Sequence, residues 1–414
     1  MQNTTIQKEW FSKGEQYAKE INEMVDFGEK NDWENWKGKE PEDTRSHLAE
    51  TVFNLLKTAN QNGDTETFRA EFLPAHTPII PLMENRSQSI EQLHFISGEK
   101  IIFMTGTSYE KRHAYLLDHD QVTKLGDNIQ AVGKSKQGNI FAVATDDKIS
   151  IYKGWGGELI NEFRLKQTLE SGITELIPFN DGSKIIMVTS FGIYLISTSE
   201  EKLIHPLNED DEEDWTPDID MENAALSNDN SYIVVGDQSY DHRILDPEGN
   251  TVGSVGAQSS YPHFCMFAKD DSQLITNSCH FYNGITIGIN ADQYIGADIE
   301  AYTESDDYTI IDEEMRVYAG TATEDYYILG DAYGYIKSFD KKGNRLWRHF
   351  LGSTISGMTL SDDGKTLWVG AHSGILHKLQ LDQDRRDTHS IGNANLYEEF
   401  RLLIWKEEPQ IWKW

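Results

Sequence analysis

The sequence is poor in cysteine and contains no long apolar run. Its 414 residues include two cysteines, Cys265 and Cys279, which are too few for a disulfide scaffold and are typical of a reducing compartment. Without a run of about 18 apolar residues, a transmembrane helix is excluded. The N-terminus also lacks the apolar core of a signal peptide. We therefore expect a cytoplasmic protein.

Basic residues are also scarce. The chain has 37 lysines and arginines against 69 aspartates and glutamates, so its formal net charge is −32. This excess of negative charge repels nucleic acids and anionic membrane surfaces, and neither is an expected partner. A basic protein is an acceptable partner, although solubility alone also explains an acidic surface.

Signatures of common catalytic and cofactor sites are absent from the sequence. The chain has no phosphate-binding G-x-x-x-x-G-K-[ST] loop, no dinucleotide-binding G-x-G-x-x-G, no G-x-S-x-G nucleophile elbow, no H-E-x-x-H and no C-x-x-C. We therefore assign no catalytic residue, no cofactor and no metal ligand. The two cysteines are interpreted as small apolar packing residues.

Residues 1–74 predict a helical N-terminal segment. Apolar side chains recur at helical spacing from Ile6 onwards until Gly28, which is expected to end the first helix. Pro41 suits the first turn of a second helix, and a short third helix is expected over residues 65–72. The segment forms either a packed cap over a larger domain or a docking module for a partner, with the tryptophans of NDWENWKG as anchors.

From about residue 88 the pattern changes to short strands with frequent turns. One unit recurs: an apolar strand, a polar turn, a second strand that ends in a small residue, a short turn and a third strand. The small residues lie 40, 44, 47, 40, 54 and 40 positions apart, at Thr105, Thr145, Thr189, Gly236, Thr276, Gly330 and Gly370. A period of about 44 residues with three or four strands matches a propeller blade.

Several units continue through a turn into a fourth strand, most clearly in FDKKGNRLWRHF at residues 339–350. With these repeats the chain resembles the superfamily of WD-repeat and quinoprotein-like β-propellers, over about residues 88–385. The resemblance lies in the blade pattern, because the Gly-His…Trp-Asp pair of WD repeats is missing. Asp340, Gly343 and Trp347 match one quinoprotein-type blade end; we interpret them as blade-packing residues and not as a sign of a quinone cofactor.

The repeats predict a mainly-β fold, a β-propeller of about seven blades over residues 75–414, with six or eight blades as alternatives. A ring must close, and the apolar run within residues 75–87 is a candidate closing strand. The tail at 397–414 contains three tryptophans, which we expect to pack against the helical segment or the last blade: Trp405, Trp412 and Trp414.

The fifth unit is the least regular and is rich in aromatic and histidine residues. Tyr261, His263, His280 and Tyr282 could line a pocket at a central channel. We favour their interpretation as core and edge side chains of a divergent blade.

Six consecutive acids form the most distinctive local feature: Glu209, Asp210, Asp211, Glu212, Glu213 and Asp214. They lie between the third and fourth units, which predicts an inter-blade loop. The simplest interpretation is a solvated loop. The functional alternative is a binding site for a basic partner, with the adjacent Trp215 as an apolar anchor. Calcium is a third option, but Asp218 and Asp220 lack the glycine and distal glutamate of an EF-hand.

The sequence favours non-catalytic binding of a basic protein. One specific version is a neutralising, immunity-type protein that masks a basic toxin or nuclease. Two alternatives stay open: a propeller hydrolase or lyase with a site at the central channel, and a structural scaffold of a larger assembly. The fold does not decide among them, because propeller function depends on loop chemistry.

Overall fold

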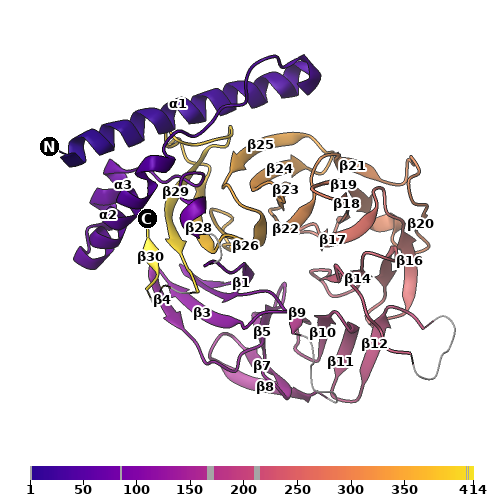
Figure 1. Cartoon of the computed structure of the whole chain (residues 1–414). Helices are drawn as coiled ribbons and strands as arrows, with labels where there is room; N and C mark the ends of the chain where they lie inside the picture. Colours follow the sequence, from indigo (N-terminus) through magenta and orange to yellow (C-terminus); the bar gives the residue numbers. More distant parts are fainter. Residues whose placement is uncertain (1, 84–85, 166–171, 209–214, 407, 409) are drawn as a thin grey trace.

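The computed structural model describes residues 2–83, 86–165, 172–208, 215–406, 408 and 410–414. Over these residues the chain forms a seven-bladed β-propeller with α-helices beside it (Figure 1). Within each blade the strands run antiparallel in sequence order, the first nearest the centre of the ring and the last at the rim (Figure 1). The predicted fold class is confirmed, and the blade number is seven.

The blades follow one another along the chain, four main strands to a blade. Blade 1 contains β1 (Ile90–Ser97), β2 (Lys100–Thr105), β3 (His113–Asp118) and β4 (Gln121–Lys124), and blade 2 contains β5 (Ala131–Lys134), β6 (Ile140–Ala144), β7 (Lys148–Lys153) and β8 (Glu158–Arg164). Blade 3 contains β9 (Ile173–Pro178), β10 (Lys184–Thr189), β11 (Gly192–Ser197) and β12 (Glu201–His205), and blade 4 contains β13 (Asn223–Leu226), β14 (Ile233–Gly236), β15 (His242–Leu245) and β16 (Thr251–Val255). Blade 5 contains β17 (Tyr261–Phe267), β18 (Gln273–His280), β19 (Asn283–Asn290) and β21 (Thr309–Asp312), and blade 6 contains β22 (Val317–Ala322), β23 (Tyr326–Asp331), β24 (Tyr335–Asp340) and β25 (Arg345–Phe350). Blade 7 contains β26 (Ile355–Leu360), β27 (Thr366–Ala371), β28 (Ile375–Leu381) and β29 (Leu396–Leu403).

Apolar side chains fill every junction between neighbouring blades. Successive side chains of a strand point to opposite faces of the sheet, so one strand serves two junctions. In β10, Ile185 and Met187 pack in the junction with blade 2, whereas Ile186 and Val188 pack in the junction with blade 4. Because both faces are buried, the middle strands are continuous apolar runs and do not alternate between apolar and polar residues.

The small residues of the repeat mark the end of the second strand correctly in most blades but not in the fifth. Thr105, Thr189 and Gly370 lie at or next to the ends of β2, β10 and β27. Thr276 instead lies in the middle of β18, which continues to His280 and pairs over eight residues with β19. The fifth blade is therefore built from longer strands than the repeat pattern predicted.

Extra strand segments cover three blades at the rim. The two-residue strand β20 (Asp298–Ile299) lies parallel to β16, and β30 (Trp412–Lys413) pairs with β29. At β25, the Phe350 amide donates to the Ile391 carbonyl at 2.9 Å. Each segment adds hydrogen bonds to a strand edge that would otherwise end the sheet.

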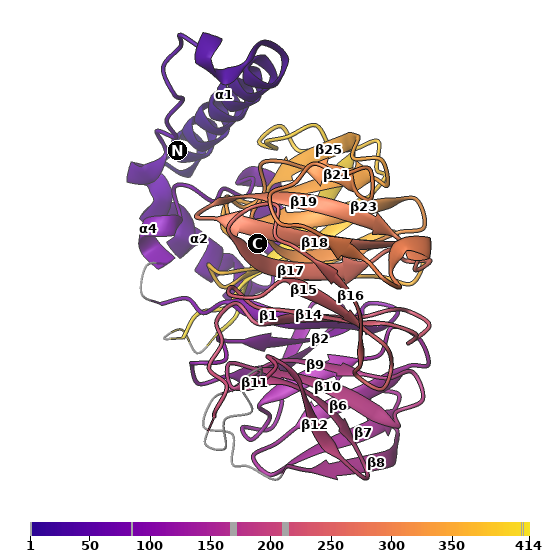
Figure 2. The same cartoon turned by 90° about the vertical axis from the view of Figure 1, so that its right-hand side faces the viewer.

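Four α-helices precede the first blade within the described residues: α1 (Gln2–Asn31), α2 (Ala49–Asn62), α3 (Thr65–Glu71) and α4 (Ile80–Met83). The expected stop at Gly28 is wrong, because α1 continues through it and the ring of Trp33 folds back onto this position, where a side chain would clash. Pro41 lies outside any helix, since α2 begins at Ala49. In the edge-on view the helices extend beyond one face of the disc (Figure 2).

The C-terminal tryptophans pack against the helices, as expected. Trp405, Trp412 and Trp414 are each at most 4% exposed. The Trp414 ring lies 6.1 Å from that of Trp10 and 5.8 Å from that of Phe68, and its indole N–H donates to the Phe72 carbonyl at 2.7 Å. The helical segment and the end of the chain therefore share one apolar core.

The ring closes through side chains. The expected closing strand within residues 75–87 is wrong, because this stretch contains α4 and its isolated bridge at Ser87 pairs with the tail and not with a blade strand. Blades 1 and 7 each take their strands from one stretch of chain. They meet through packing of Phe95 on Trp368, with ring centroids 5.7 Å apart, and through ion pairs such as Lys413–Asp120 at 2.7 Å.

Trp414→Ala is expected to lower the free energy of unfolding by about 3–5 kcal/mol, because it empties a large buried site and removes a buried hydrogen bond. Chemical denaturation measures the change. Trp33→Ala is the matched control: Trp33 is 48% exposed, and its loss is expected to cost about 1 kcal/mol or less. Equal losses in the two variants would contradict the role given to the tail.

Candidate functional site

Because neighbouring strands of a blade run antiparallel, the loops of the propeller gather on two faces, which differ in their chemistry. The turns between first and second strands and between third and fourth strands lie on one face, which we call the turn face. The turns between second and third strands, and the connections between blades, lie on the other. This separation follows from the antiparallel order of the four main strands of every blade. The loop before β21 is an exception, because it runs along β16 as β20 and reaches the opposite face at Tyr302, whose amide donates to the Ala257 carbonyl.

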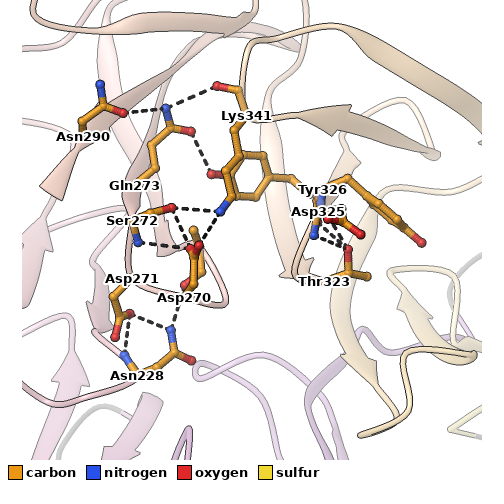
Figure 3. Close-up of polar contacts among 12 residues, drawn as sticks. Asn228, Asp270, Asp271, Ser272, Gln273, Asn290, Thr323, Asp325, Tyr326 and Lys341 are labelled. Carbon is orange, nitrogen blue, oxygen red and sulfur yellow. Dashed lines mark hydrogen bonds and ion pairs between the residues drawn. The ribbon is translucent and has the colours of Figure 1, made fainter.

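On the turn face, polar side chains and main-chain N–H groups bind one another across blade junctions. The Asn180 side-chain oxygen accepts from the main-chain N–H of Gln137 at 2.8 Å, and the main-chain N–H of Asn180 donates to the Asn230 side-chain oxygen at 2.6 Å. Further round the ring, Asn228 donates through its main-chain amide to Asp271 at 2.7 Å (Figure 3). The side chains thus form a belt from turn to turn.

The belt continues with charged groups between blades 5 and 6. The Lys341 ammonium donates to Asp270 at 2.7 Å and to the Ser272 hydroxyl at 2.9 Å (Figure 3). Burial opposes ionisation of Asp270, but the hydrogen bonds from Lys341 and Ser272 outweigh it and lower the pKa of Asp270 to about 2. Gln273 joins the same network by donating from its side chain to the Lys341 carbonyl at 3.4 Å, and it accepts from the Tyr327 hydroxyl at 2.8 Å. The polar groups of this belt hold blades together, so we assign them a structural role.

The opposite face carries exposed aromatic side chains, and we call it the aromatic face. They stand on the turns between the second and third strands of four blades and are 42–74% exposed: Tyr109, Tyr240, Phe281, Tyr282 and Tyr333. A large aromatic side chain on a loop gains little stability from the fold when it is exposed. Grouped on one face, such side chains are typical of an interaction surface.

The sequence-predicted partner site falls in the connection from blade 3 to blade 4, whose described residues from Trp215 onwards lie on the aromatic face. Its six acids, residues 209–214, lie outside the described residues. Trp215 is described and is partly buried. Beyond it, Asp218 and Asp220 are exposed on either side of Ile219, which is buried and whose amide donates to the Ser190 carbonyl at 2.8 Å. The buried isoleucine fixes this part of the connection, while the two carboxylates remain in water.

Tyr109 connects the aromatic and the acidic parts of this surface. Its pKa is raised, first by partial burial and then by the negative charge of three carboxylates, of which Glu222 contributes most. The other two are Asp220 and Asp218. An exposed ring in the field of several carboxylates suits a cationic side chain, which both the ring face and the charges attract.

A second cluster lies beside this surface, at the start of β22. The Arg316 guanidinium donates to the Phe281 carbonyl at 2.9 Å and to the His263 ring at 3.4 Å, and it stands 4.8 Å from the centre of the Tyr318 ring. Burial, and then the Arg316 charge, lower the pKa of His263 to about 3. His263 is therefore neutral near pH 7 and is a poor proton donor there.

The aromatic residues of the fifth unit divide between core and surface. His263 is half-buried and packs edge-on against Tyr318 at 4.6 Å, in line with the packing interpretation. Tyr261, at the start of β17, and Tyr282, on the turn after β18, are exposed, so these two are edge and not core side chains of the blade. Cys265 and Cys279 are free and buried, as expected of packing residues.

Sequence reasoning missed four of the five exposed aromatics, Phe281 among them, although the repeat contained a signal for the other three. Tyr109 and Tyr240 each follow the small residue of their unit by four positions, and Tyr333 follows Gly330 by three. Because the small residue marks the end of the second strand, an aromatic residue at this offset must lie on the turn to the third strand. Position within the repeat, and not composition, identifies the aromatic face.

One carboxyl group on the innermost strands titrates far from its ordinary range. Removal from water raises the pKa of Glu175, on β9, to about 7, and Lys136 opposes the shift only in part. The same carboxylate, after burial itself, raises the pKa of the Cys265 thiol. The interior of the ring thus holds a carboxyl group that changes charge near neutral pH.

The remaining tests concern metals, membranes and known relatives. Among the described residues, no group of three or more histidine, cysteine, aspartate or glutamate side chains is arranged to hold a metal ion. No helix within the described part of the chain is long and apolar enough to cross a membrane. No protein-family model and no curated protein matches the chain.

Glu175→Gln is expected to remove a pH dependence of stability. Because the folded-state pKa of about 7 exceeds the ordinary value of 4.5, the folded state binds more protons between these values, and stability falls as the pH rises through them. The variant is expected to be more stable than the parent above pH 7, by on the order of 2 kcal/mol, and to lose this advantage below about pH 4.5. Chemical denaturation of both chains at about pH 5 and about pH 8 measures this difference in stability. An equal gain in stability at the two pH values would contradict the raised pKa assigned to Glu175.

Proposed function

We propose that this protein is a non-catalytic binding protein that engages a basic protein partner through its aromatic face. A propeller is a rigid disc that presents many loops, and the loops determine what it binds. Here the polar groups of the turn-face belt are engaged with one another. The aromatic face instead carries large exposed rings. This difference between the two faces favours the aromatic face as the binding surface.

The observation that carries the proposal is the placement of exposed aromatics next to acids. Tyr109 lies in the field of Asp218, Asp220 and Glu222, and Trp215 belongs to the same connection between blades. Aromatic anchors supply most of the affinity of a protein interface when they are desolvated. Carboxylates around them add selectivity for a positively charged surface and speed the encounter.

The charge of the whole chain supports the same partner class. A net charge of −32 attracts basic proteins over a distance of about one Debye length, roughly 8 Å at physiological ionic strength. An acidic protein of this kind suits the neutralisation of a basic toxin or nuclease, since it would occupy the site that binds an anionic substrate. This immunity-type role is the most specific version of the proposal.

Affinity capture tests the proposal with three forms of the full chain. The intact chain is expected to retain a basic protein at low salt and release it at high salt, because exposed ion pairs are screened. Replacing the acids of 209–214 by their amides, or introducing Phe281→Ser with Tyr282→Ser, is expected to weaken binding of the identified partner by about tenfold or more. The affinity is measured by titration of the purified partner.

The control replaces exposed apolar residues away from the aromatic face. Leu159→Ser with Ile295→Ser removes comparable apolar surface, because both side chains are at least 50% exposed, on the outer strand β8 and on the turn face. This variant is expected to bind as the intact chain does. The proposal is wrong if the control loses the partner equally, or if no captured protein is basic and salt-sensitive.

A further inference from the structure

A small polar cavity lies where the helical segment meets blades 6 and 7. The helix α1 runs along the outer side of these blades (Figure 1), and Phe350 and Ile391 pack against its apolar side chains. Next to this contact remains a cavity of about 60 Å³. One water needs about 10–15 Å³ of such a volume, so the cavity has room for about four waters or for one ion of that size.

Six stretches of chain line the cavity. Tyr17 of α1 contributes, and so do Glu398 and Arg401 of β29. The rest of the lining comes from loops and strand ends: residues 43 and 45, 73–77, 349–351, 387 and 389–391. Some lining residues are half-buried, which opens the cavity to water: Tyr17, Asp43, Thr77, His389 and Ser390. A small solute can therefore enter.

The fold leaves His349, a buried side chain at this cavity, without a hydrogen bond. His349 is 8% exposed, and its ring nitrogens have no partner within the described residues, yet they are not sealed off by protein atoms. Burial is the largest effect on this ring and lowers the pKa of His349 to about 3, so the imidazole is neutral near pH 7. A neutral imidazole has one N–H donor and one acceptor nitrogen. Both are available to a molecule in the cavity.

Further nitrogen atoms behind the cavity surface also lack partners. Arg401 donates through Nε and Nη2 to the Glu398 carboxylate at 2.9 and 3.0 Å, whereas its Nη1 atom is buried and unpaired within the described residues. Both ring nitrogens of His76 are in the same state. Because these atoms are covered, Arg401 acts on a ligand through its charge and not by direct contact. A guanidinium with an unsatisfied N–H favours a negatively charged neighbour.

The net charge of the surroundings limits the charge of the ligand. The fixed charges at the cavity cancel in three ion pairs: Arg45 with Asp43 at 2.6 Å, Arg69 with Asp387 at 3.4 Å and Arg401 with Glu398 at 2.9 Å. Burying a doubly charged ion there is costly, while a monoanion costs less and still gains from the unsatisfied guanidinium. Within the described part of the chain, no group of side chains is arranged to hold a metal ion.

The neutral imidazole selects among monoanions. A ligand beside it must accept the ring N–H in one tautomer and donate to the bare nitrogen in the other. Monoanionic phosphate does either, because it carries both oxygen acceptors and O–H groups. Sulfate has no O–H near neutral pH and is doubly charged, so the same cavity disfavours it.

We propose that this cavity binds one inorganic phosphate ion in its monoanionic form, with His349 as the side chain in direct contact. The phosphate oxygens exchange hydrogen bonds with the imidazole, and the charge of Arg401 stabilises the ion from behind. The site does not rest on the proposed partner binding, because none of its lining residues belongs to the aromatic face.

Calorimetric titration of the full chain with potassium phosphate near neutral pH, at constant ionic strength, is the test. One phosphate per chain is expected to bind, and sulfate is expected to bind about tenfold more weakly or less. A phosphate monoester such as phosphoserine is also expected to bind more weakly, because the cavity has no room for its organic part. A chain of net charge −32 repels anions, so binding to the general surface contributes little.

His349→Leu is expected to weaken phosphate binding by about tenfold or more without lowering the melting temperature of the phosphate-free chain. The reason is that the ring makes no hydrogen bond that the empty fold would lose. Phosphate is expected to raise the melting temperature of the parent but not of this variant. Ser390→Ala removes a half-buried hydroxyl at the cavity and is expected to weaken binding by about fivefold.

The matched control is His47→Leu, which removes an imidazole that is 54% exposed and does not line the cavity. It is expected to bind phosphate as the parent does. The phosphate site is wrong if the parent gives no binding heat, which would mean that water alone fills the cavity, or if sulfate binds as tightly as phosphate. It is also wrong if His349→Leu binds as the parent does. Should that variant not fold, unchanged binding in Ser390→Ala overturns the site.

Discussion

Each blade of this protein must bury both faces of its sheet, and the rest of the structure follows from that constraint. A strand such as β10 sends alternate side chains to two different junctions, so no blade is stable without its neighbours. The ring must therefore be complete, and the apolar demand of the middle strands leaves the loops as the main places where polar and aromatic chemistry varies freely. The sheets thus supply the stability of the fold, and the loop tips are free to vary in surface chemistry.

Ring completion places a special demand on the junction between the last and first blades. Many contacts across it are made by side chains, among them Phe95 with Trp368 and the ion pair of Lys413 with Asp120. The tail and the helical segment reinforce this junction through the shared core around Trp414. The helices are therefore part of the closure.

The sequence predicted the regular part of this architecture and failed where local pattern is weak. Strand alternation, the turn residues and the small residue at Thr105 or Gly370 recur from blade to blade, so seven units could be counted. The short apolar run within residues 75–87 is compatible with a strand and with a helix. The sequence therefore could not show that it forms the helix α4. The exposed rings of Tyr109 and Tyr240 escaped notice because burial depends on which end of a blade a turn occupies.

The segments that cover β16, β25 and β29 have a consequence for self-association. A rim strand exposes unpaired N–H and C=O groups, and such an edge is a template on which a second chain can form an intermolecular sheet. Blades 4, 6 and 7 present covered edges, whereas β4, β8, β12 and β21 end their sheets within the described residues. Aggregation by edge pairing is thereby confined to the rims of these four blades, where charged side chains on the edge strands oppose it.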